Sequence, residues 1–299
     1  MDIIAKQDIN LVSLIKRFKS EDKCLAYLES LRWPDGIKCP RCASKSVSRI
    51  KERDQFDCND CRYQFSATSK TIFHDTHLPL WQWFLAVYMM IEAKKGISAN
   101  QLKRTLGVSY KTAWYLCHRI RAAMHEAYPM PLKGMIEIDE TFVGGKKHGA
   151  KGYQGKAVVV GAIQRGGKIL LQVAPDRSKP SLQNFIWKNT QSRADAYITD
   201  DFSGYKGIED ENTRHEVLNH TLGEYDRNGL NTNSIENVWS LLKRSIVGSY
   251  HKISVKHLDA YLDELEWRFN NRDNEYLFRD TILKLVASEK LPYEKLVAS

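Results

Sequence analysis

Two cysteine pairs limit most strongly what this chain can fold into. Cys39 and Cys42 form one C-x-x-C pair, and Cys58 and Cys61 form a second pair after fifteen intervening residues. Zn²⁺ favours a tetrahedron of soft ligands, and each C-x-x-C turn offers two thiolates from one tight loop. The spacing therefore predicts a zinc ribbon with four thiolate ligands and a structural Zn²⁺, over residues 35–70.

Other uses of the four cysteines are disulfide bonds or a redox C-x-x-C pair. Disulfides fit poorly with a chain that we expect to be cytoplasmic, and a redox pair does not explain the second C-x-x-C. A segment this short buries little apolar surface, so we expect it to need the metal in order to fold. The spacing leaves open whether the ribbon binds nucleic acid, binds protein or braces a neighbouring element.

The charge balance of the chain points to a polyanionic partner. Lys and Arg number 45 against 36 Asp and Glu, which gives a formal net charge of +9. Nucleic acid is the first candidate partner, although a basic housekeeping enzyme would have the same charge. No apolar run approaches the length of a membrane span, and the N-terminus lacks the layout of a signal peptide. We therefore expect a cytoplasmic protein that has no membrane partner.

The N-terminal part of the chain is expected to be helical on both sides of the ribbon. Residues 1–34 form one helical segment in this interpretation, with a single helix over Leu11–Leu31. Residues 76–128 begin with a helix from Leu78 to Lys95 and continue as a helix-turn-helix. In that pair, Ser98 and Ser109 begin the two helices and Gly107 makes the turn between them.

The second helix of this pair carries a basic and aromatic set of side chains. We expect these residues to project outward and bind DNA, because a reader of the major groove needs such a face. They are Lys111, Tyr115, His118 and Arg119, with Arg121 on the flank. The alternative is an ordinary helical hairpin whose basic face is solvated.

After Pro131 the pattern changes to that of a mixed α/β domain, which we expect over residues 132–299 together with the C-terminal helices. Three strands come first, followed by helix, strand, short helix, strand and helix. That order is typical of a ribonuclease-H-like fold with a mixed sheet. The expected strands are 135–143, 157–164, 168–174, 194–199 and 215–218, and the expected helices are 180–192 and one starting at Ser234.

Three carboxylates in this domain are predicted to form a metal site. Asp139 lies in the first strand, Asp200 ends the fourth, and Glu236 lies on the late helix. Like charges at close range repel one another unless a cation lies between them, and hard oxygen ligands favour Mg²⁺ or Mn²⁺. Two such ions support in-line phosphoryl transfer. Lys243 follows Glu236 on the same side of the helix and is placed to hold a phosphate.

Several neighbouring residues are alternatives to these assignments. Glu140 and Asp201 each follow a chosen aspartate, and a slip of one residue in strand register would exchange them. Glu137 is a weaker alternate because it shares a strand face with Asp139. A basic loop after the first strand either contacts DNA or is only solvated, and it contains Lys146, Lys147, His148 and Lys151. His220 is either near the site or an ordinary loop histidine, and Arg272 is a candidate for contact with backbone phosphate.

These motifs together resemble the DDE transposases of bacterial insertion sequences, in the group that has a zinc ribbon and a helix-turn-helix before a ribonuclease-H-like domain. The resemblance covers nearly the whole chain. It rests on CPRC at 39–42, the second C-x-x-C, LGVSYKTAW at 106–114, IDET at 138–141, TD at 199–200 and SIENVWSLLKR at 234–244.

The resemblance implies that Asp139, Asp200 and Glu236 are catalytic metal ligands and that Lys243 is an accessory basic residue. It also implies dependence on Mg²⁺, binding to terminal inverted repeats, and a dimer or higher oligomer on double-stranded DNA near the nucleoid. We expect Lys243 and Arg244 to contact that DNA. The enzyme would nick element ends and join the freed 3′-OH to target DNA. The alternatives are a nuclease or resolvase that does not join strands, and a DNA-binding regulator derived from a transposase.

Overall fold

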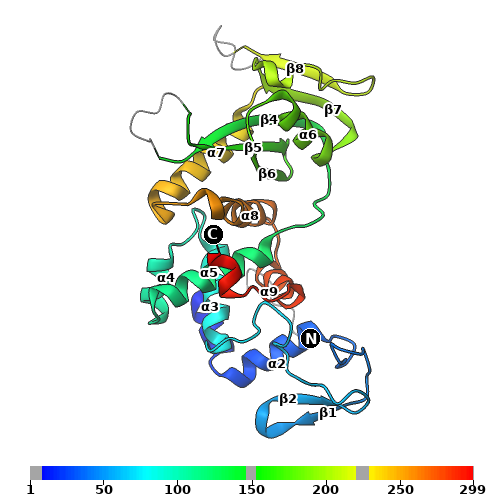
Figure 1. Cartoon of the computed structure of the whole chain (residues 1–299), viewed down its shortest axis with the longest axis vertical. Helices are drawn as coiled ribbons and strands as arrows, with labels where there is room; N and C mark the ends of the chain where they lie inside the picture. Colours follow the sequence, from blue (N-terminus) through cyan, green and yellow to red (C-terminus); the bar gives the residue numbers. More distant parts are fainter. Residues whose placement is uncertain (1–8, 146–152, 220–228, 299) are drawn as a thin grey trace. The chain divides into compact units, whose positions relative to one another are not determined.

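The computed structural model describes residues 9–145, 153–219 and 229–298, with backbone alone at 191–193. The chain divides into two compact units, which are described separately below (Figure 1). The first unit contains residues 1–124 together with 272–299, and the second contains residues 125–271. In the described part of the chain, no helix combines the length and the apolar character needed to cross a bilayer.

The first unit begins with two short helices, α1 (Leu11–Arg17) and α2 (Glu21–Arg32). The prediction of one helix over Leu11–Leu31 is wrong, because the chain leaves the helical conformation between Phe18 and Ser20. Phe18 is buried at this break and packs edge to face on Phe84, with ring centroids 4.8 Å apart. The break therefore places an aromatic ring in the core of the unit.

The ribbon is a small antiparallel sheet of three strands, β1 (Val47–Ile50), β2 (Gln55–Cys58) and β3 (Gln64–Phe65). A 3₁₀ turn (Lys51–Arg53) joins β1 to β2. Aromatic rings pack together in the core of the ribbon, where the ring centroids of Trp33 and Phe56 lie 5.5 Å apart. The Arg32 guanidinium donates hydrogen bonds to the carbonyl oxygens of Ser66, Ala67 and Ser69, which ties the chain after the ribbon to α2.

The helix-turn-helix pair forms as its start and stop signals predict. It follows α3 (Leu80–Glu92) and consists of α4 (Ala99–Leu106) and α5 (Tyr110–Met124). The hydroxyl of Ser98 accepts the amide hydrogen of Gln101 at 3.0 Å, and the hydroxyl of Ser109 accepts that of Thr112 at 3.1 Å. Gly107 ends α4 with φ of 68°, a left-handed conformation that favours glycine.

The end of the chain folds with the first unit. We expected the C-terminal helices to belong to the mixed-sheet domain, and for residues 272–299 that prediction is wrong. Helix α9 (Leu277–Ala287) packs on α2, α3 and α5, and its Phe278 ring lies 6.0 Å from that of Phe84. The short helix α10 (Tyr293–Val297) follows it. The apolar side of α9 is therefore buried among helices that are more than 150 residues earlier in the chain.

The second unit is built on a five-stranded mixed sheet in the order β6-β5-β4-β7-β8. Strands β4, β5 and β6 pair antiparallel, whereas β7 pairs parallel with β4 and β8 pairs parallel with β7. This is the ribonuclease-H-like arrangement that the order of elements predicted. The strand bounds are β4 (Leu132–Val143), β5 (Ala157–Gln164), β6 (Ile169–Ala174), β7 (Thr190–Asp200) and β8 (Arg214–Leu218).

Helices cover both faces of this sheet (Figure 1). On one face lie α6 (Lys179–Asn189) and the 3₁₀ turn η3 (Ser203–Tyr205), and on the other lie α7 (Asn233–Ser245) and α8 (Leu258–Asn270). A π turn, η5 (Ile246–Tyr250), and a 3₁₀ turn, η6 (Val255–His257), connect α7 to α8. Alternate residues of a strand point to opposite faces, so Ile136 and Ile138 join the α6 core while Glu137 and Asp139 face α7.

Helix α8 closes the edge of the sheet at β6. Carboxylate and amide oxygens on one side of α8 accept the backbone amide hydrogens of alternate β6 residues. Asn270 accepts from Ile169 at 2.7 Å and Glu266 accepts from Leu171 at 2.9 Å. This edge is consequently not available for pairing with another strand.

Candidate active site

A cavity of about 540 Å³ opens beside the start of α7 and the ends of β4 and β7. It brings together the three carboxylates and the lysine that the sequence singled out. Its lining consists of Asp139, Glu140, Thr141, Asp200, Thr232, Glu236, Trp239, Ser240, Lys243 and Arg244. Residues separated by about 100 positions in the sequence therefore share one small volume.

Asp139 is a partly buried carboxylate of this cavity. The indole Nε1 of Trp239 donates a hydrogen bond to its Oδ2 at 2.9 Å. Burial, together with smaller contributions from the nearby charges of Glu140 and Asp200, raises the pKa of Asp139 from its ordinary value to about 7. A cation in the cavity would favour the ionised carboxylate, because an opposite charge lowers a carboxyl pKa.

The Trp239 ring lies against a glycine on the neighbouring strand. Gly161 is directly opposite Asp139 in the antiparallel register of β4 and β5. A methyl group added at Gly161 would lie 2.5 Å from Cη2 of Trp239 and 2.9 Å from Cδ2 of Leu171. Since real Cβ atoms do not approach that closely, the absence of a side chain at Gly161 makes room for the indole.

Glu140 points to the opposite face of the sheet. Its carboxylate accepts hydrogen bonds from the guanidinium of Arg177 and the hydroxyl of Tyr205. Burial raises the pKa of Glu140, and the contacts with Tyr205 and Arg177 oppose that shift. Arg177 also stacks over Phe202, with its Cζ 3.5 Å from the ring centroid. The register therefore directs Asp139, not Glu140, toward α7.

Asp200 and Glu236 complete the acidic lining. Glu137 on β4 is in register with Ile198 on β7, so Asp139 and Asp200 lie at the same end of the sheet. Asp200 accepts the amide hydrogen of Phe202 at 3.1 Å. Glu236 lies in the first turn of α7 and accepts the hydroxyl hydrogen of Thr232 at 2.9 Å.

The basic side of the cavity comes from the last turn of α7. Lys243 and Arg244 are both exposed there and line the cavity. The Nε of Arg244 donates to the carbonyl oxygen of Ser240 at 3.2 Å. By contrast, Asp201 is exposed and does not line the cavity, which leaves Asp200 as the aspartate of this pair that faces the site.

Asp139, Asp200 and Glu236 line the cavity from two strands and a helix. Among the described residues, the four cysteines form the one group of three or more metal-ligating side chains whose ligand atoms all lie within 4.8 Å. The acidic site is therefore wider than the cysteine site. Its donors are hard oxygens, which match Mg²⁺ or Mn²⁺ better than Zn²⁺.

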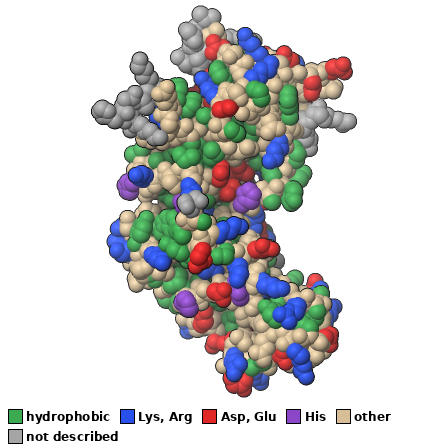
Figure 2. Space-filling model, in the orientation of Figure 1, with side chains coloured by type: hydrophobic (Ala, Val, Ile, Leu, Met, Phe, Trp, Pro, Cys, Tyr) green, Lys and Arg blue, Asp and Glu red, His purple; other side chains and the backbone are tan. Residues whose placement is uncertain are grey.

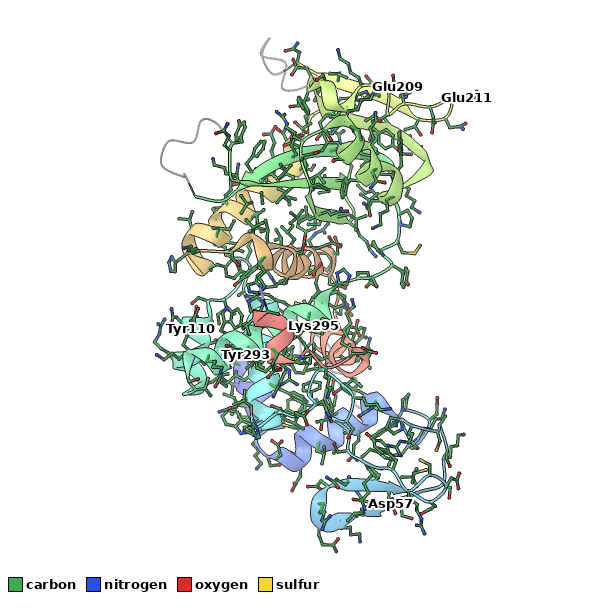
Figure 3. All side chains as sticks on the ribbon, in the orientation of Figure 1. Asp57, Tyr110, Glu209, Glu211, Tyr293 and Lys295 are labelled. Atoms are coloured by element: carbon green, nitrogen blue, oxygen red, sulfur yellow. The ribbon has the colours of Figure 1, made fainter. Side chains whose placement is uncertain are left out.

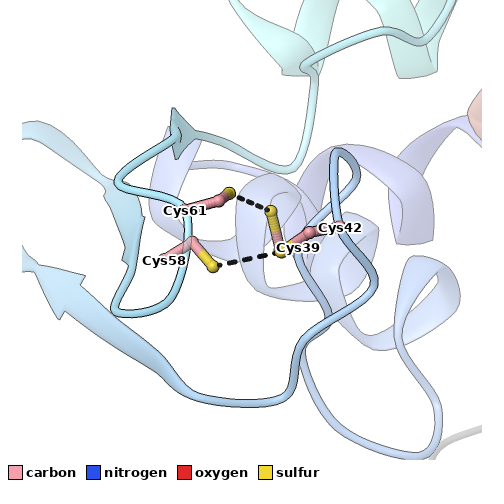
Figure 4. A group of neighbouring side chains, drawn as sticks. All are labelled: Cys39, Cys42, Cys58 and Cys61. Atoms are coloured by element: carbon pink, nitrogen blue, oxygen red, sulfur yellow. Dashed lines mark hydrogen bonds between the residues drawn. The ribbon is translucent and has the colours of Figure 1, made fainter.

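The four cysteines of the ribbon converge as their spacing predicted (Figure 4). The Sγ atoms of Cys39 and Cys61 lie 3.6 Å apart, and those of Cys42 and Cys58 lie 3.5 Å apart. Zn–S bonds of about 2.3 Å in a tetrahedron place the sulfur atoms about 3.8 Å apart, so the cluster fits a structural Zn²⁺ closely. The exposed surface of the ribbon carries both signs of charge, with Lys51 and Arg53 next to Glu52 and Asp54 (Figure 2).

The expected DNA-reading face of α5 is mostly buried, so the prediction that His118 and Arg119 project outward is wrong, and Arg121, which was expected on the flank of that face, is also buried. The side chain of Arg119 turns inward because its guanidinium donates to the carbonyl oxygens of Ile72 and His74. The sequence pattern did not reveal that the chain after the ribbon covers this side of the helix.

The first residues of α5 are the part of this helix that is exposed to solvent. Lys111 is exposed, whereas Tyr115 is half-buried and its hydroxyl donates to the carbonyl oxygen of Leu291. Tyr293 of α10, which is labelled in Figure 3, has its ring 5.4 Å from the Tyr115 ring and 4.4 Å from the Nζ of Lys111. Tyr110 begins the helix and is also exposed.

Other residues considered from the sequence are outside the site or outside the described residues. Arg272 pairs with Asp273 at 3.5 Å in the first unit. The remaining candidates lie in the ranges that the structure does not describe: Lys146, Lys147, His148, Lys151 and His220.

Two segments of the chain match known protein families. Residues 131–270 match the ISXO2-like transposase domain, and residues 19–64 match the transposase zinc-ribbon domain. The chain therefore contains an ISXO2-like transposase domain preceded by a transposase zinc ribbon. The first match spans β4 to α8, so it contains the whole acidic cavity and ends where the second unit ends.

Relatives from two organisms agree with these two matches. A protein of Halobacterium salinarum described as an uncharacterized protein in transposable element ISH50 is 29% identical over 278 residues, which cover 85% of this chain and 92% of that protein. An uncharacterized transposase-like protein of Haemophilus influenzae is 29% identical over 106 residues, which cover 36% of this chain and 84% of that protein.

Sequence reasoning missed two residues that hold carboxylates of β4 in place. Trp239 was interpreted only as part of the apolar stripe of α7, although its position three residues after Glu236 places it on nearly the same side of the helix. Arg177, the partner of Glu140, carried no signal because it lies in a loop before α6.

Proposed function

We propose that this chain is a DNA transposase that cuts the ends of an insertion sequence and joins the freed 3′-OH to target DNA. The observation that supports this most is the single cavity shared by Asp139, Asp200, Glu236 and Lys243 in a domain of a transposase family. In this assignment the carboxylates are catalytic and hold Mg²⁺ or Mn²⁺, and Lys243 and Arg244 bind phosphate oxygens of the DNA.

The donor set fits two divalent cations of this kind. When bound, such ions would supply activation of the attacking oxygen and stabilisation of the leaving oxygen in an in-line displacement at phosphorus. Asp139, Asp200 and Glu236 would provide the ligands from two strand ends and a helix. The raised pKa of Asp139 supports this role, because burial without a cation disfavours its charged form.

The exposed cations at the cavity rim would orient the DNA. Lys243 and Arg244 lie two helical turns after Glu236, where they can contact a phosphate beside the one that reacts. Charge-assisted contacts to phosphate fix the register of a duplex without reading its sequence. They would therefore position the scissile bond relative to the carboxylates.

Recognition of the terminal inverted repeats belongs to the first unit in this proposal. The exposed candidates on the helix-turn-helix are Lys103 and Arg104 of α4 and Tyr110 and Lys111 of α5. Tyr115 is half-buried and would contribute at the edge of such a surface. His118, Arg119 and Arg121 are withdrawn from the DNA-binding set because they are buried. We further propose that the protein acts as a dimer or higher oligomer on DNA in the cytoplasm, at the nucleoid.

The proposal is tested by incubating the purified full chain with DNA carrying the repeats that flank its gene, target plasmid and Mg²⁺. Element ends joined covalently to the target, with no product when EDTA is added, are the expected result. Cleavage without joining would identify a nuclease or resolvase, and binding without cleavage would identify a DNA-binding regulator.

A further inference from the structure

We propose that Glu137 and Arg165 are positioning residues that fix the first turn of α7, and with it the orientation of Glu236 toward Asp139. The catalytic part of this inference rests on the proposed function, whereas the structural part stands by itself. Glu137 lies two residues before Asp139 on β4 and its side chain is completely buried. One strand therefore carries both a carboxylate of the cavity and the residue that anchors the helix opposite it.

Glu137 binds the N-terminus of α7 directly. Its Oε2 accepts the backbone amide hydrogens of Ser234 at 2.8 Å and Ile235 at 3.1 Å. Its Oε1 accepts the hydroxyl hydrogen of Ser234 at 2.9 Å. These amides are among those that a helix leaves without partners in its first turn, and a carboxylate there is also favoured by the helix dipole.

Arg165 extends this anchor to the segment before the helix. Its Nε donates to Oε1 of Glu137 at 2.9 Å. Its two terminal nitrogens donate to the carbonyl oxygens of Gly229 at 2.8 Å and Asn231 at 2.9 Å. The backbone of Arg165 is itself fixed, because its amide donates to the carbonyl oxygen of Met135 on β4 at 3.0 Å. The planar guanidinium thus joins β4, β5 and the entry to α7 in one rigid arrangement.

These contacts distinguish Glu137 from the cavity carboxylates. It does not line the cavity, and both of its oxygens are occupied by hydrogen-bond donors. The donor Ser234, which Glu137 holds, is only two residues before Glu236 in the chain. A second contact, from Trp239 to Asp139, fixes the next turn of α7 to the same strand. Together the two contacts define both the rotation and the height of the helix on β4.

The consequence for catalysis is a change in cation affinity. Each residue of an α-helix rises by about 1.5 Å, so even a fractional slip of α7 would move Glu236 by a large part of a metal–oxygen bond length. Residues that orient metal ligands without touching the metal commonly change affinity or activity by about 10–100-fold when they are replaced. In the proposed function DNA recognition belongs to the first unit, so the replacements should leave DNA binding unchanged.

The test compares Glu137→Gln with Glu264→Gln in the full-length protein. A glutamine keeps one accepting oxygen at position 137 but cannot accept all four hydrogen bonds or pair with Arg165. Glu264 is a matched control because it is equally buried and also has an arginine partner, Arg268 at 3.3 Å. Amide hydrogen exchange at residues 233–236 and the Mg²⁺ concentration for half-maximal end cleavage are measured for both variants and the wild type.

Glu137→Gln should speed exchange at Ser234 and Ile235 at least about tenfold and raise the Mg²⁺ requirement about 10–100-fold. At saturating Mg²⁺ the single-turnover rate of Glu137→Gln should recover to near the wild-type rate. Glu264→Gln should change neither the amide exchange at residues 233–236 nor the Mg²⁺ requirement. Arg165→Gln should act in the same direction even if Glu137→Gln fails to fold, because Arg165 is only partly buried, with 22% of its side chain exposed, whereas Glu137 is completely buried.

Unchanged exchange in folded Glu137→Gln or Arg165→Gln, or a lower rate with an unchanged Mg²⁺ requirement, would overturn the inference. If the wild type neither cleaves nor joins DNA, the proposed function fails. The exchange rates and Mn²⁺ binding measured by calorimetry would still decide whether Glu137 and Arg165 position the helix.

Discussion

Trp239 and Asp139 join α7 to β4 through one hydrogen bond of 2.9 Å between the indole Nε1 and the carboxylate Oδ2. The donor comes from the helix that carries Glu236, and the acceptor is itself a cavity carboxylate. The indole of Trp239 therefore packs in the hydrophobic core and also orients Asp139, a candidate metal ligand. The position of the indole depends on the space above Gly161.

Gly161→Ala should displace that indole. The added methyl group would lie 2.5 Å from the Trp239 ring, and overpacking of this kind typically costs about 1–3 kcal/mol of unfolding free energy. We expect a lower midpoint in urea and a loss of end cleavage at standard Mg²⁺. Gly248→Ala is the control, because no atom lies within 4 Å of its Cβ position. A Gly161→Ala variant with wild-type stability and cleavage would contradict the assigned packing.

Cys39→Ser should remove zinc from the ribbon. Three thiolates and a hydroxyl bind Zn²⁺ more weakly than four thiolates, and a segment of this size depends on its metal to fold. We expect one equivalent of zinc in the wild type, a large loss in the variant, and rapid proteolysis between residues 39 and 66. Cys24→Ser should keep its zinc, since Cys24 is buried in α2 outside the cluster. Equal zinc content in the two variants would argue against the site.

Arg119→Ala should destabilise the first unit and not act mainly on DNA affinity. The guanidinium is buried and donates hydrogen bonds to the carbonyl oxygens of Ile72 and His74. Buried acceptors left without a donor lower the free energy of unfolding by about 1–3 kcal/mol.

The exposed Lys111 should have the opposite effect. Lys111→Ala should weaken DNA binding and reduce the slope of the logarithm of the binding constant against the logarithm of the salt concentration by about one, without destabilising the first unit. Chemical denaturation and binding titrations at several salt concentrations separate the two. Equal stability of both variants would show that Arg119 is not buried in solution.

Glu266 should make the stability of the second unit depend on pH. Burial raises its pKa to about 7, so the folded state keeps a proton that the unfolded state loses above the ordinary value of 4.5. The contribution of Glu266 to the unfolding free energy therefore falls as the pH rises from about 4.5 to about 7. Urea denaturation at pH 5 and pH 7.5 should show a smaller decrease for Glu266→Gln than for the wild type. Parallel decreases in the two proteins would contradict the raised pKa.

The sequence was most informative where the signal is local. The C-x-x-C spacing, the caps at Ser98 and Ser109, and the alternation along β4 and β5 each depend on residues close together in the chain, and each appears in the structure. The motif around Glu236 also predicted that Glu236 and Lys243 lie on the same side of α7, because helix periodicity determines which residues share a face, and both residues line the cavity.

The failures concern contacts between distant segments. The face of α5 that includes Arg119 looks solvated from its own sequence, but residues 72–74 cover it. Periodicity also cannot show that α9 packs with α2 and α3, or that Glu137 binds the start of a helix 97 positions later. Charged residues such as Arg119 and Glu137 can be buried because specific partners form hydrogen bonds with them, and the sequence does not reveal those partners.

The most direct measurement is Mg²⁺-dependent joining of end DNA by Asp139→Asn, Asp200→Asn, Glu236→Gln and Asp201→Asn. Removing a ligand charge that supplies about 3 kcal/mol of transition-state stabilisation slows a reaction about 100-fold, so the first three variants should be inactive at the detection limit while still binding DNA. Asp201→Asn should join ends at nearly the wild-type rate, because Asp201 is exposed and outside the cavity. Normal joining by any of the first three variants, or its loss in Asp201→Asn alone, would contradict the assignment of the catalytic carboxylates.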